Sequence, residues 1–165
     1  MKTRSKFFSV SIVIIIVIYI GYNLERNRET TFSPEDEFPI VEQTINNILG
    51  WAIEKDFKLF FNTIANDSAF ISVTPYNRVK FGFDAVKADS AFWGDTRFKA
   101  IGHELNDLHL NFSKDGTVAW FYCNLNDYNT WDGEPANWLN TRWTGVLEKR
   151  ENKWRVVQQH FSFPK

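Results

Sequence analysis

The chain has 165 residues, a net charge of −1 and an aromatic content of 17%. This charge balance gives no basic field for nucleic acid and no acidic run for storing cations, so neither class of function is expected. The single cysteine, Cys123, excludes an intrachain disulfide and a cysteine-based metal site, and we expect it to be a buried bystander. The length fits one globular domain with an appendage.

The N-terminus has the pattern of an export signal. Three basic residues precede the apolar run Phe7–Ile20. Residues 1–22 are therefore predicted to be either an uncleaved signal anchor, in the membrane through residues 7–22, or a cleaved signal peptide. About 16 apolar residues fall just short of the roughly 17–25 that span a bilayer, and Tyr19 stands where cleavage requires a small residue, so both alternatives stay open. The domain is expected outside the cytoplasm, membrane-anchored or, after cleavage, secreted or periplasmic.

The next part of the chain predicts helices. Residues 23–37 are polar and predict a linker, although the proline and acids at its end suit the first turn of a helix. Apolar residues recur at helical spacing over residues 38–53, which predicts a helix with one buried stripe. Asp56 is expected to cap a second, shorter helix. A third helix is expected over residues 83–93.

The remaining segments predict strands. Residues 69–73 and 78–81 are expected to form a small hairpin before the third helix. Turns at residues 114–116 and 132–135 separate long strands in the second half of the chain. Residues 140–164 place two apolar runs around a charged tip, which predicts a hairpin at the centre of the sheet. Helices segregated from a largely antiparallel sheet define an α+β fold.

Several short motifs, each different, are distributed along residues 38–165. They are Trp51-Ala52-Ile53-x-x-Asp56-Phe57, the small turn ending in Gly82 before a helix bearing Trp93, Asp115-Gly116-Thr117-Val118-Ala119-Trp120, Arg142-x-Thr144-x-Val146, and Lys153-Trp154-x-Val156-Val157 leading into His160-Phe161-Ser162-Phe163-Pro164. In this order and spacing they resemble the SnoaL-like branch of the nuclear-transport-factor-2-like superfamily.

The resemblance implies a cone over residues 38–165. In such a cone a curved, mostly antiparallel sheet wraps around three N-terminal helices and leaves a ligand-sized cavity at its open end; here a hydrophobic helix would precede it. The resemblance also implies a homodimer through the outer face of the sheet. This superfold hosts isomerases, dehydratases, cyclases, carriers and assembly modules, so the fold alone leaves the function open.

The resemblance argues against one activity. Family members that resemble ketosteroid isomerase place a general-base Asp on the strand after the second helix, and that position falls near Ser72 in this chain. A serine cannot abstract a proton unaided. Polyketide-cyclase relatives use an acid on a later strand, for which Asp127 is a candidate counterpart with a poor local match.

Strand alternation then predicts a pocket. Residues two apart share a face of a strand, and the resemblance suggests that the Trp154 face turns inward, which would aim His160 into the cavity. With the matching faces of the neighbouring strands and a helical roof, the predicted ligand-binding residues are Trp93, Tyr122, Asn124, Arg142, Gln158 and His160.

Each of these residues also has an alternative role. Arg142 would face either a ligand carboxylate or a protein partner such as Glu104, because a buried guanidinium needs one. His160 is a candidate proton shuttle or a hydrogen-bonded structural histidine. Trp93 and Trp120 suit a core as well as a ligand platform.

No metal site and no cofactor are expected. His103 and His109 lie six residues apart on one strand, roughly 20 Å, and the chain has no phosphate-binding glycine loop, nucleophile elbow or dinucleotide fingerprint. Three functions remain. The preferred prediction is a domain that binds a small, partly apolar ligand. The alternatives are a dimerisation module with a filled cavity and an isomerase, dehydratase or cyclase that uses His160.

Overall fold

The structure, a computed structural model, describes residues 32–76 and 78–164. The predicted signal segment, residues 1–22, lies outside the described residues, so its membrane and export roles stay predictions. Within the described ranges no helix is both long and apolar enough to cross a membrane.

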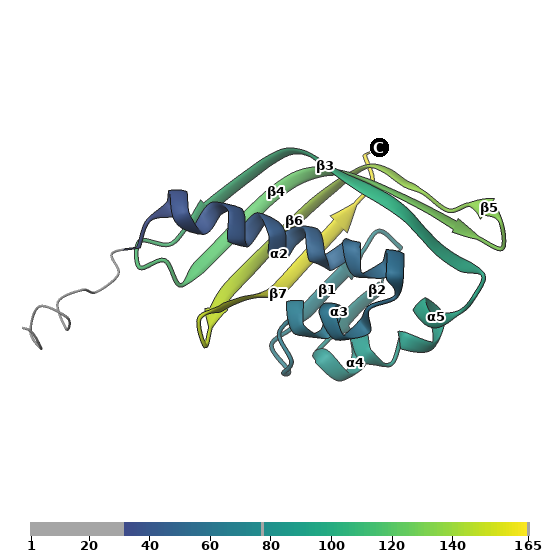
Figure 1. Ribbon diagram of the computed structural model, residues 1–165, viewed down its shortest axis with the longest axis horizontal. Coiled ribbons are helices and arrows are strands. Elements are labelled where there is room, and N and C mark those ends of the chain that lie inside the picture. Colours follow the sequence, from purple (N-terminus) through teal and green to yellow (C-terminus); the bar gives the residue numbers. More distant parts are fainter. Residues whose placement is uncertain (1–31, 77, 165) are drawn as a thin grey trace, which may run out of the picture. The chain divides into compact units, whose positions relative to one another are not determined.

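Two helices begin the described chain (Figure 1). Helix α2 spans Pro34–Glu54 and α3 spans Phe57–Thr63. The Ser33 side chain accepts the backbone N–H of Asp36 at the start of α2, and Pro34 occupies the first turn, where its missing N–H costs no helical hydrogen bond. Asp56 caps α3 through the backbone N–H of Leu59 at 2.9 Å, as predicted.

Helix α2 takes up the last four residues of the predicted linker, because Glu37 is bound to the sheet. Its carboxylate pairs with Lys149 and accepts the indole N–H of Trp154 at 2.6 Å. Burial acts to raise the pKa of Glu37, but the hydrogen bonds from Lys149 and Trp154 outweigh it, and the pKa is lowered. The first turn of α2 is therefore part of the domain.

The predicted third helix is divided into two short helices, α4 (Phe83–Lys87) and α5 (Ser90–Gly94). Lys80 explains the break, because its Nζ donates to the carbonyl oxygen of Ala85 at 3.3 Å and to Asp89 at 2.7 Å. The Asp89 N–H, which would bond to Ala85 in a continuous α-helix, instead donates to the carbonyl oxygen of Val86.

One mixed sheet curves around α2, and α3 to α5 gather at the end where β1 and β2 lie (Figure 1). Its strand order is β2-β1-β7-β6-β4-β3, with β5 on β4; every pair is antiparallel except β1 with β7. The α+β cone is thereby confirmed, with β6 and β7 central as predicted. The strands are β1 (Ile71–Thr74), β2 (Arg78–Phe81), β3 (Phe98–Phe112), β4 (Val118–Trp131), β5 (Glu134–Pro135), β6 (Trp138–Arg150) and β7 (Lys153–Ser162).

Irregularities in register accompany the curvature of the long strands. The β3–β4 pairing shifts after Ala100 and after Asn106, and the β4–β6 pairing shifts after Leu125. Between β6 and β7, Val146 of β6 pairs with Gln158, but the next residue of β6, Leu147, pairs with Val156. This leaves Val157 of β7 as an extra residue. Such bulges bend a strand and change which side chains face the core.

The core lies between α2 and the concave face of the sheet. Trp143, in the middle of β6, is fully buried between Phe121 and Phe161, and its register partner on β4, Cys123, is also fully buried. Burial raises the pKa of the Cys123 thiol to about 12, in keeping with its expected inert role. The core residues of α2 and the sheet are Val41, Ile45, Ile48, Trp51, Ala52, Phe98, Ala119, Phe121, Cys123, Leu125, Trp143, Leu147, Trp154, Val156, Val157 and Phe161.

Gly145 allows the sheet to pack against itself at one point. A Cβ there would lie 2.5 Å from Cε1 of Phe121 and 2.9 Å from the carbonyl oxygen of Gln158. We expect Gly145→Ala to lower the free energy of unfolding by about 1–3 kcal/mol, the usual effect of overpacking a core. Chemical denaturation measures this change. Gly102→Ala is the matched control, because a Cβ there has no atom within 4 Å; equal effects of the two substitutions would contradict the packing role.

Candidate functional site

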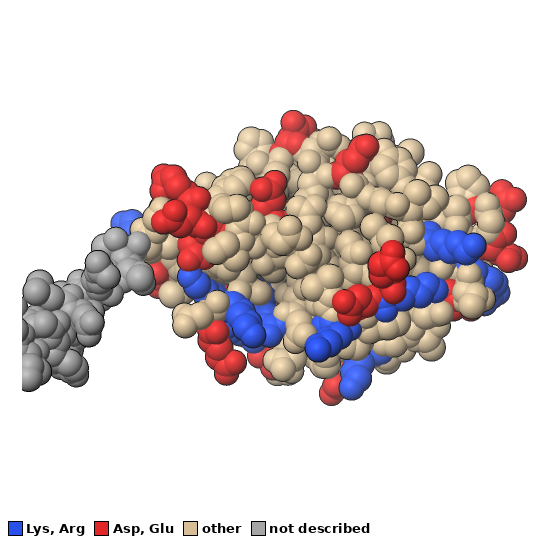
Figure 2. All heavy atoms as spheres, in the orientation of Figure 1, with Lys and Arg blue, Asp and Glu red and all other residues tan. Residues whose placement is uncertain are grey.

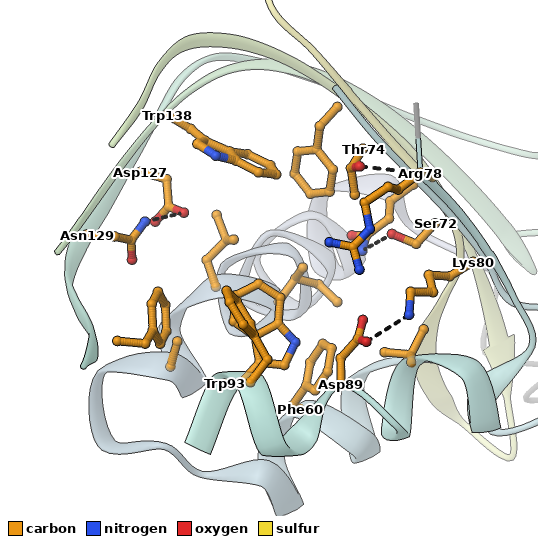
Figure 3. Close-up of a pocket in the computed structure, with 18 of the residues that line it drawn as sticks. Phe60, Ser72, Thr74, Arg78, Lys80, Asp89, Trp93, Asp127, Asn129 and Trp138 are labelled. Carbon is orange, nitrogen blue, oxygen red and sulfur yellow. Dashed lines mark hydrogen bonds and ion pairs between the residues drawn. The ribbon is translucent and has the colours of Figure 1, made fainter. Parts of the chain in front are cut away.

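A cavity of about 510 Å³ lies between the helices and the concave face of the sheet, with walls from α2, α3, α4, α5, β1, β2, β3, β4, β6 and β7 (Figure 3). Its volume falls in the range of small-molecule sites, roughly 300–1,000 Å³. Large aromatic side chains form most of the apolar lining, and these are Trp51, Phe60, Tyr76, Phe92, Trp93, Phe98, Trp131, Trp138 and Phe161.

Contacts between these rings hold the apolar walls in place. Trp51 stacks on Phe60 at 4.6 Å between ring centroids, and Trp93 meets Trp51 edge to face at 6.4 Å. On another wall Phe92 stacks on Trp131 at 5.0 Å. Because each ring is braced by another, the walls form a preformed apolar surface suited to a flat ligand.

The β1–β2 hairpin gives the cavity a polar wall. Its eight residues alternate, and cross-strand pairing puts Ser72 opposite Lys80 and Thr74 opposite Arg78. All four of these polar residues line the cavity. The other face of the hairpin carries Ile71, Val73, Val79 and Phe81, and Phe81 is 68% exposed. The hairpin thus reverses the usual pattern of apolar residues inside and polar residues outside.

A buried amide lies beside this wall on β7. The side-chain N–H of Gln159 donates to Ser72 Oγ at 3.1 Å, and both residues are at least nine-tenths buried. The other end of the amide, Oε1, has no hydrogen-bond partner among the described residues. Buried polar atoms are normally paired, so Gln159 is suited to a hydrogen-bonding molecule in the cavity.

Two cations lie on β2, and they differ in their partners. Lys80 forms an ion pair with Asp89 at 2.7 Å. Arg78 has no carboxylate partner within residues 32–76 and 78–164, and its side chain points into the cavity (Figure 3). Arg78 therefore supplies the unpaired positive charge of this wall.

The opposite side of the cavity carries Asp127 and Asn129 from β4 (Figure 3). Asn129 donates to the Asp127 carboxylate at 2.8 Å. Burial raises the pKa of Asp127, and the single hydrogen bond from Asn129 offsets this only in part. A carboxyl group whose pKa is raised by burial in a cavity is a candidate proton donor or acceptor.

Of the predicted ligand-binding residues, only Trp93 lines this cavity. Arg142 and His160 are exposed on the outer face of the sheet, where Tyr122, Asn124 and Gln158 also lie. The Tyr122 hydroxyl donates to Asn124, and Arg142 donates to the carbonyl oxygen of Phe163 at 2.9 Å. The structure keeps these residues near one another but places them on the wrong side of the sheet for the cavity.

The extra residue on β7 explains this error. Trp154 faces inward, as expected, but the bulge at Val157 reverses the alternation, so Gln159 and Phe161 face the cavity and His160 does not. The predicted pocket combined the face of β7 that carries His160 with the faces of β6 and β4 that carry Thr144 and Tyr122. In the sheet His160 pairs with Thr144, which pairs in turn with Tyr122, so all three faces lie on the outer side.

The proposed pairing of Arg142 with Glu104 is also not found, because Glu104 accepts hydrogen bonds from Asn126 and Tyr128. His103 contacts Asn46 of α2 at 3.1 Å. Across the described ranges no group of three or more His, Cys, Asp or Glu side chains is placed to hold a metal ion.

Sequence reasoning missed most of the polar lining. Ser72 and Asp127 were singled out only through the resemblance, and Arg78, Lys80 and Gln159 were not proposed for the site. The alternation in Ile71–Thr74 and Arg78–Phe81 was a usable signal. Its usual interpretation, with the apolar face inward, would have placed the polar residues in solvent.

The chain belongs to the SnoaL-like domain family, whose model matches residues 41–165. No curated protein matches the sequence.

Solved structures share the fold at low identity. An NTF2-like protein from Prochlorococcus is 18% identical, with a TM-score of 0.62 over 81% of this chain and 95% of that one. A proposed dehydratase of the NTF2-like family from Streptomyces avermitilis is 16% identical, with a TM-score of 0.65 over 81% and 99%. A proposed scytalone dehydratase from Novosphingobium aromaticivorans is 15% identical, with a TM-score of 0.66 over 76% and 82%. At these identities the likeness concerns the fold.

The environment of Asp127 can be tested by titration. We expect its carboxyl carbon, followed by NMR, to titrate above the ordinary pKa of 3.8, because burial disfavours the charged form. Asp115 is the internal control, since hydrogen bonds from Ser113 and Thr117 lower its pKa.

A raised folded-state pKa means that ionising Asp127 destabilises the fold. Asp127→Asn should therefore be more stable than the wild type at neutral pH, with no difference below pH 3.8. Titration of Asp127 at or below 3.8 would contradict this description of the cavity.

Proposed function

We propose that this SnoaL-like domain binds a small, partly apolar ligand in its cavity. The observation that carries the proposal is the inward-facing polar side of the β1–β2 hairpin. Ser72, Thr74, Arg78 and Lys80 face the cavity, while Val79 and Phe81 face solvent. Polar groups next to an apolar core cost free energy unless they are hydrogen-bonded, so a fold under selection for stability alone would favour the opposite orientation.

The aromatic walls and the Gln159 amide support the same proposal. Braced rings such as Trp51 on Phe60 provide a large apolar contact surface, and the free end of the Gln159 amide provides a hydrogen-bonding group beside it. A cavity that is mostly apolar with a few convergent polar groups is the usual form of a small-molecule site. A dimerisation module with a filled cavity would need neither the space nor these groups.

The proposal is tested by native mass spectrometry of the full chain, purified gently from its source. We expect extra mass that disappears on denaturation. Ala136→Trp, which puts a large ring on an exposed position of the cavity lining, should abolish the extra mass. Ala69→Trp, exposed and outside the lining, is the matched control and should retain it. If the wild type carries no added mass even after exposure to a metabolite extract, the dimerisation module becomes the better proposal.

An enzyme is the second candidate function, and Asp127 is the observation that favours it. Its raised pKa and its position opposite Arg78 suit proton transfer to or from a bound ligand, a role that the sequence had suggested for His160. Two proteins of similar fold, from Streptomyces avermitilis and Novosphingobium aromaticivorans, are named as proposed dehydratases, and that activity is proposed for those two proteins.

The two candidates differ in turnover. Once the retained ligand is identified by its mass, its conversion by the wild type would establish an enzyme. Asp127→Asn should then lower the rate by about 10²–10⁴-fold, the usual contribution of a general acid or base. His160→Ala, on the outer face, is the control and should leave the rate unchanged. Equal losses from both substitutions would contradict the role of Asp127.

Two other expectations are also proposals. The basic and apolar N-terminal pattern supports a domain held outside the cytoplasm, by a signal anchor or after export. The family resemblance implies a homodimer through the outer face of the sheet. The same native mass spectra report the oligomeric state, and a monomer at micromolar concentration would contradict the homodimer.

A further inference from the structure

We infer that the cavity selects a small organic monoanion: a flat apolar body that lies against the aromatic walls, with a carboxylate held by Arg78. This inference rests on the proposed function, because it names the chemical class of the ligand for the same cavity. It is carried by the balance and the placement of charges along the lining.

Four charged side chains line the cavity, two cations and two carboxyl groups. Lys80 and Asp89 neutralise each other at 2.7 Å. Asp127 lies on the opposite side of the cavity, where it accepts a hydrogen bond from Asn129 and forms no ion pair with a described residue. Arg78 is therefore the cation of the lining that has no carboxylate partner among the described residues and is free to bind an anionic ligand.

The position of Arg78 follows from the pairing of the hairpin. Arg78, the first residue of β2, lies opposite Thr74, and strand alternation sends both side chains toward the cavity. Figure 3 shows the guanidinium projecting into the space between the hairpin and the aromatic rings. A guanidinium binds a carboxylate through two parallel hydrogen bonds, which Lys80, already occupied by Asp89, is not free to do.

The opposite wall sets the orientation of the ligand and limits its charge. Asp127 lies at the end of the cavity away from Arg78, so a ligand carboxylate is directed to the Arg78 end. Only one cation is available, so a dianion such as a phosphate monoester would keep an unpaired charge next to an apolar surface, which is costly. The ligand class that fits is a monocarboxylate with its polar end at the β1–β2 hairpin.

The inference is tested with an isosteric pair of probes, 2-naphthoate and 2-naphthamide, titrated into the full-length protein by calorimetry. The wild type should bind the carboxylate at least about tenfold more tightly than the amide, because a charge-assisted hydrogen bond contributes at least that factor. The preference should fall at high salt. In Arg78→Gln the two probes should bind equally, and Arg78→Lys should recover part of the preference. Arg142→Gln, an exposed arginine on the outer face, is the control and should behave as the wild type.

The outcomes separate this inference from the proposed function. Equal binding of both probes by the wild type would overturn the selection for an anion while leaving the ligand-binding proposal in place. A carboxylate preference that survives in Arg78→Gln would overturn the role of Arg78. If neither probe binds the wild type, and native spectra show no retained molecule, both proposals fail together.

Discussion

The curvature of the long sheet is the constraint on which the rest of this structure depends. A flat sheet would meet α2 along a narrow line, whereas the curved one surrounds it and buries residues such as Ile45 and Trp143 completely. Close approach of neighbouring strands is part of this geometry, since the Phe121 ring occupies the space that a side chain at position 145 would need. The same curvature leaves room at one end, where the short helices and the β1–β2 hairpin surround a cavity (Figure 1).

The chemistry of that end differs from the rest of the inner surface. Along the middle of α2 and the long strands the core is apolar, but at the hairpin Ser72 and Lys80 replace it, with the Gln159 amide at the boundary. On the face drawn in Figure 2, basic side chains lie mostly along the lower side, with acidic side chains among them and further acidic side chains above. Recognition by shape and a few inward polar groups is consistent with a small molecule as the partner.

The sequence predicted the fold well and the site poorly, for different physical reasons. The caps, the helical stripe and the turn residues are local signals, and α2, Asp56 and the β6–β7 hairpin were all expected from them. The identity of the cavity-facing residues is a long-range property, because it depends on how each strand is registered against its neighbours. Trp93 was placed correctly because helical position does not depend on strand register.

The hairpin residues were missed for a separate reason. Pattern rules assume that the apolar side of a strand faces inward, and β2 does the reverse, with Val79 and Phe81 exposed. Exceptions of this kind are expected where a site has been selected against the demands of packing. Arg78 could therefore be recognised only once the pairing with Thr74 and the position of the hairpin were known.

The bulge on β7 has a consequence for how proteins of this shape diverge. Loss of Val157 would restore simple alternation and leave Gln159 facing inward and His160 outward, because Val156 and Gln158 already pair with the adjacent residues Leu147 and Val146. A change of one residue in the length of a central strand can thus be absorbed by a bulge, while the pocket lining and the hydrogen-bonded ladder persist. For this architecture, the spacing of lining residues along the sequence can change by one between proteins that keep the same pocket.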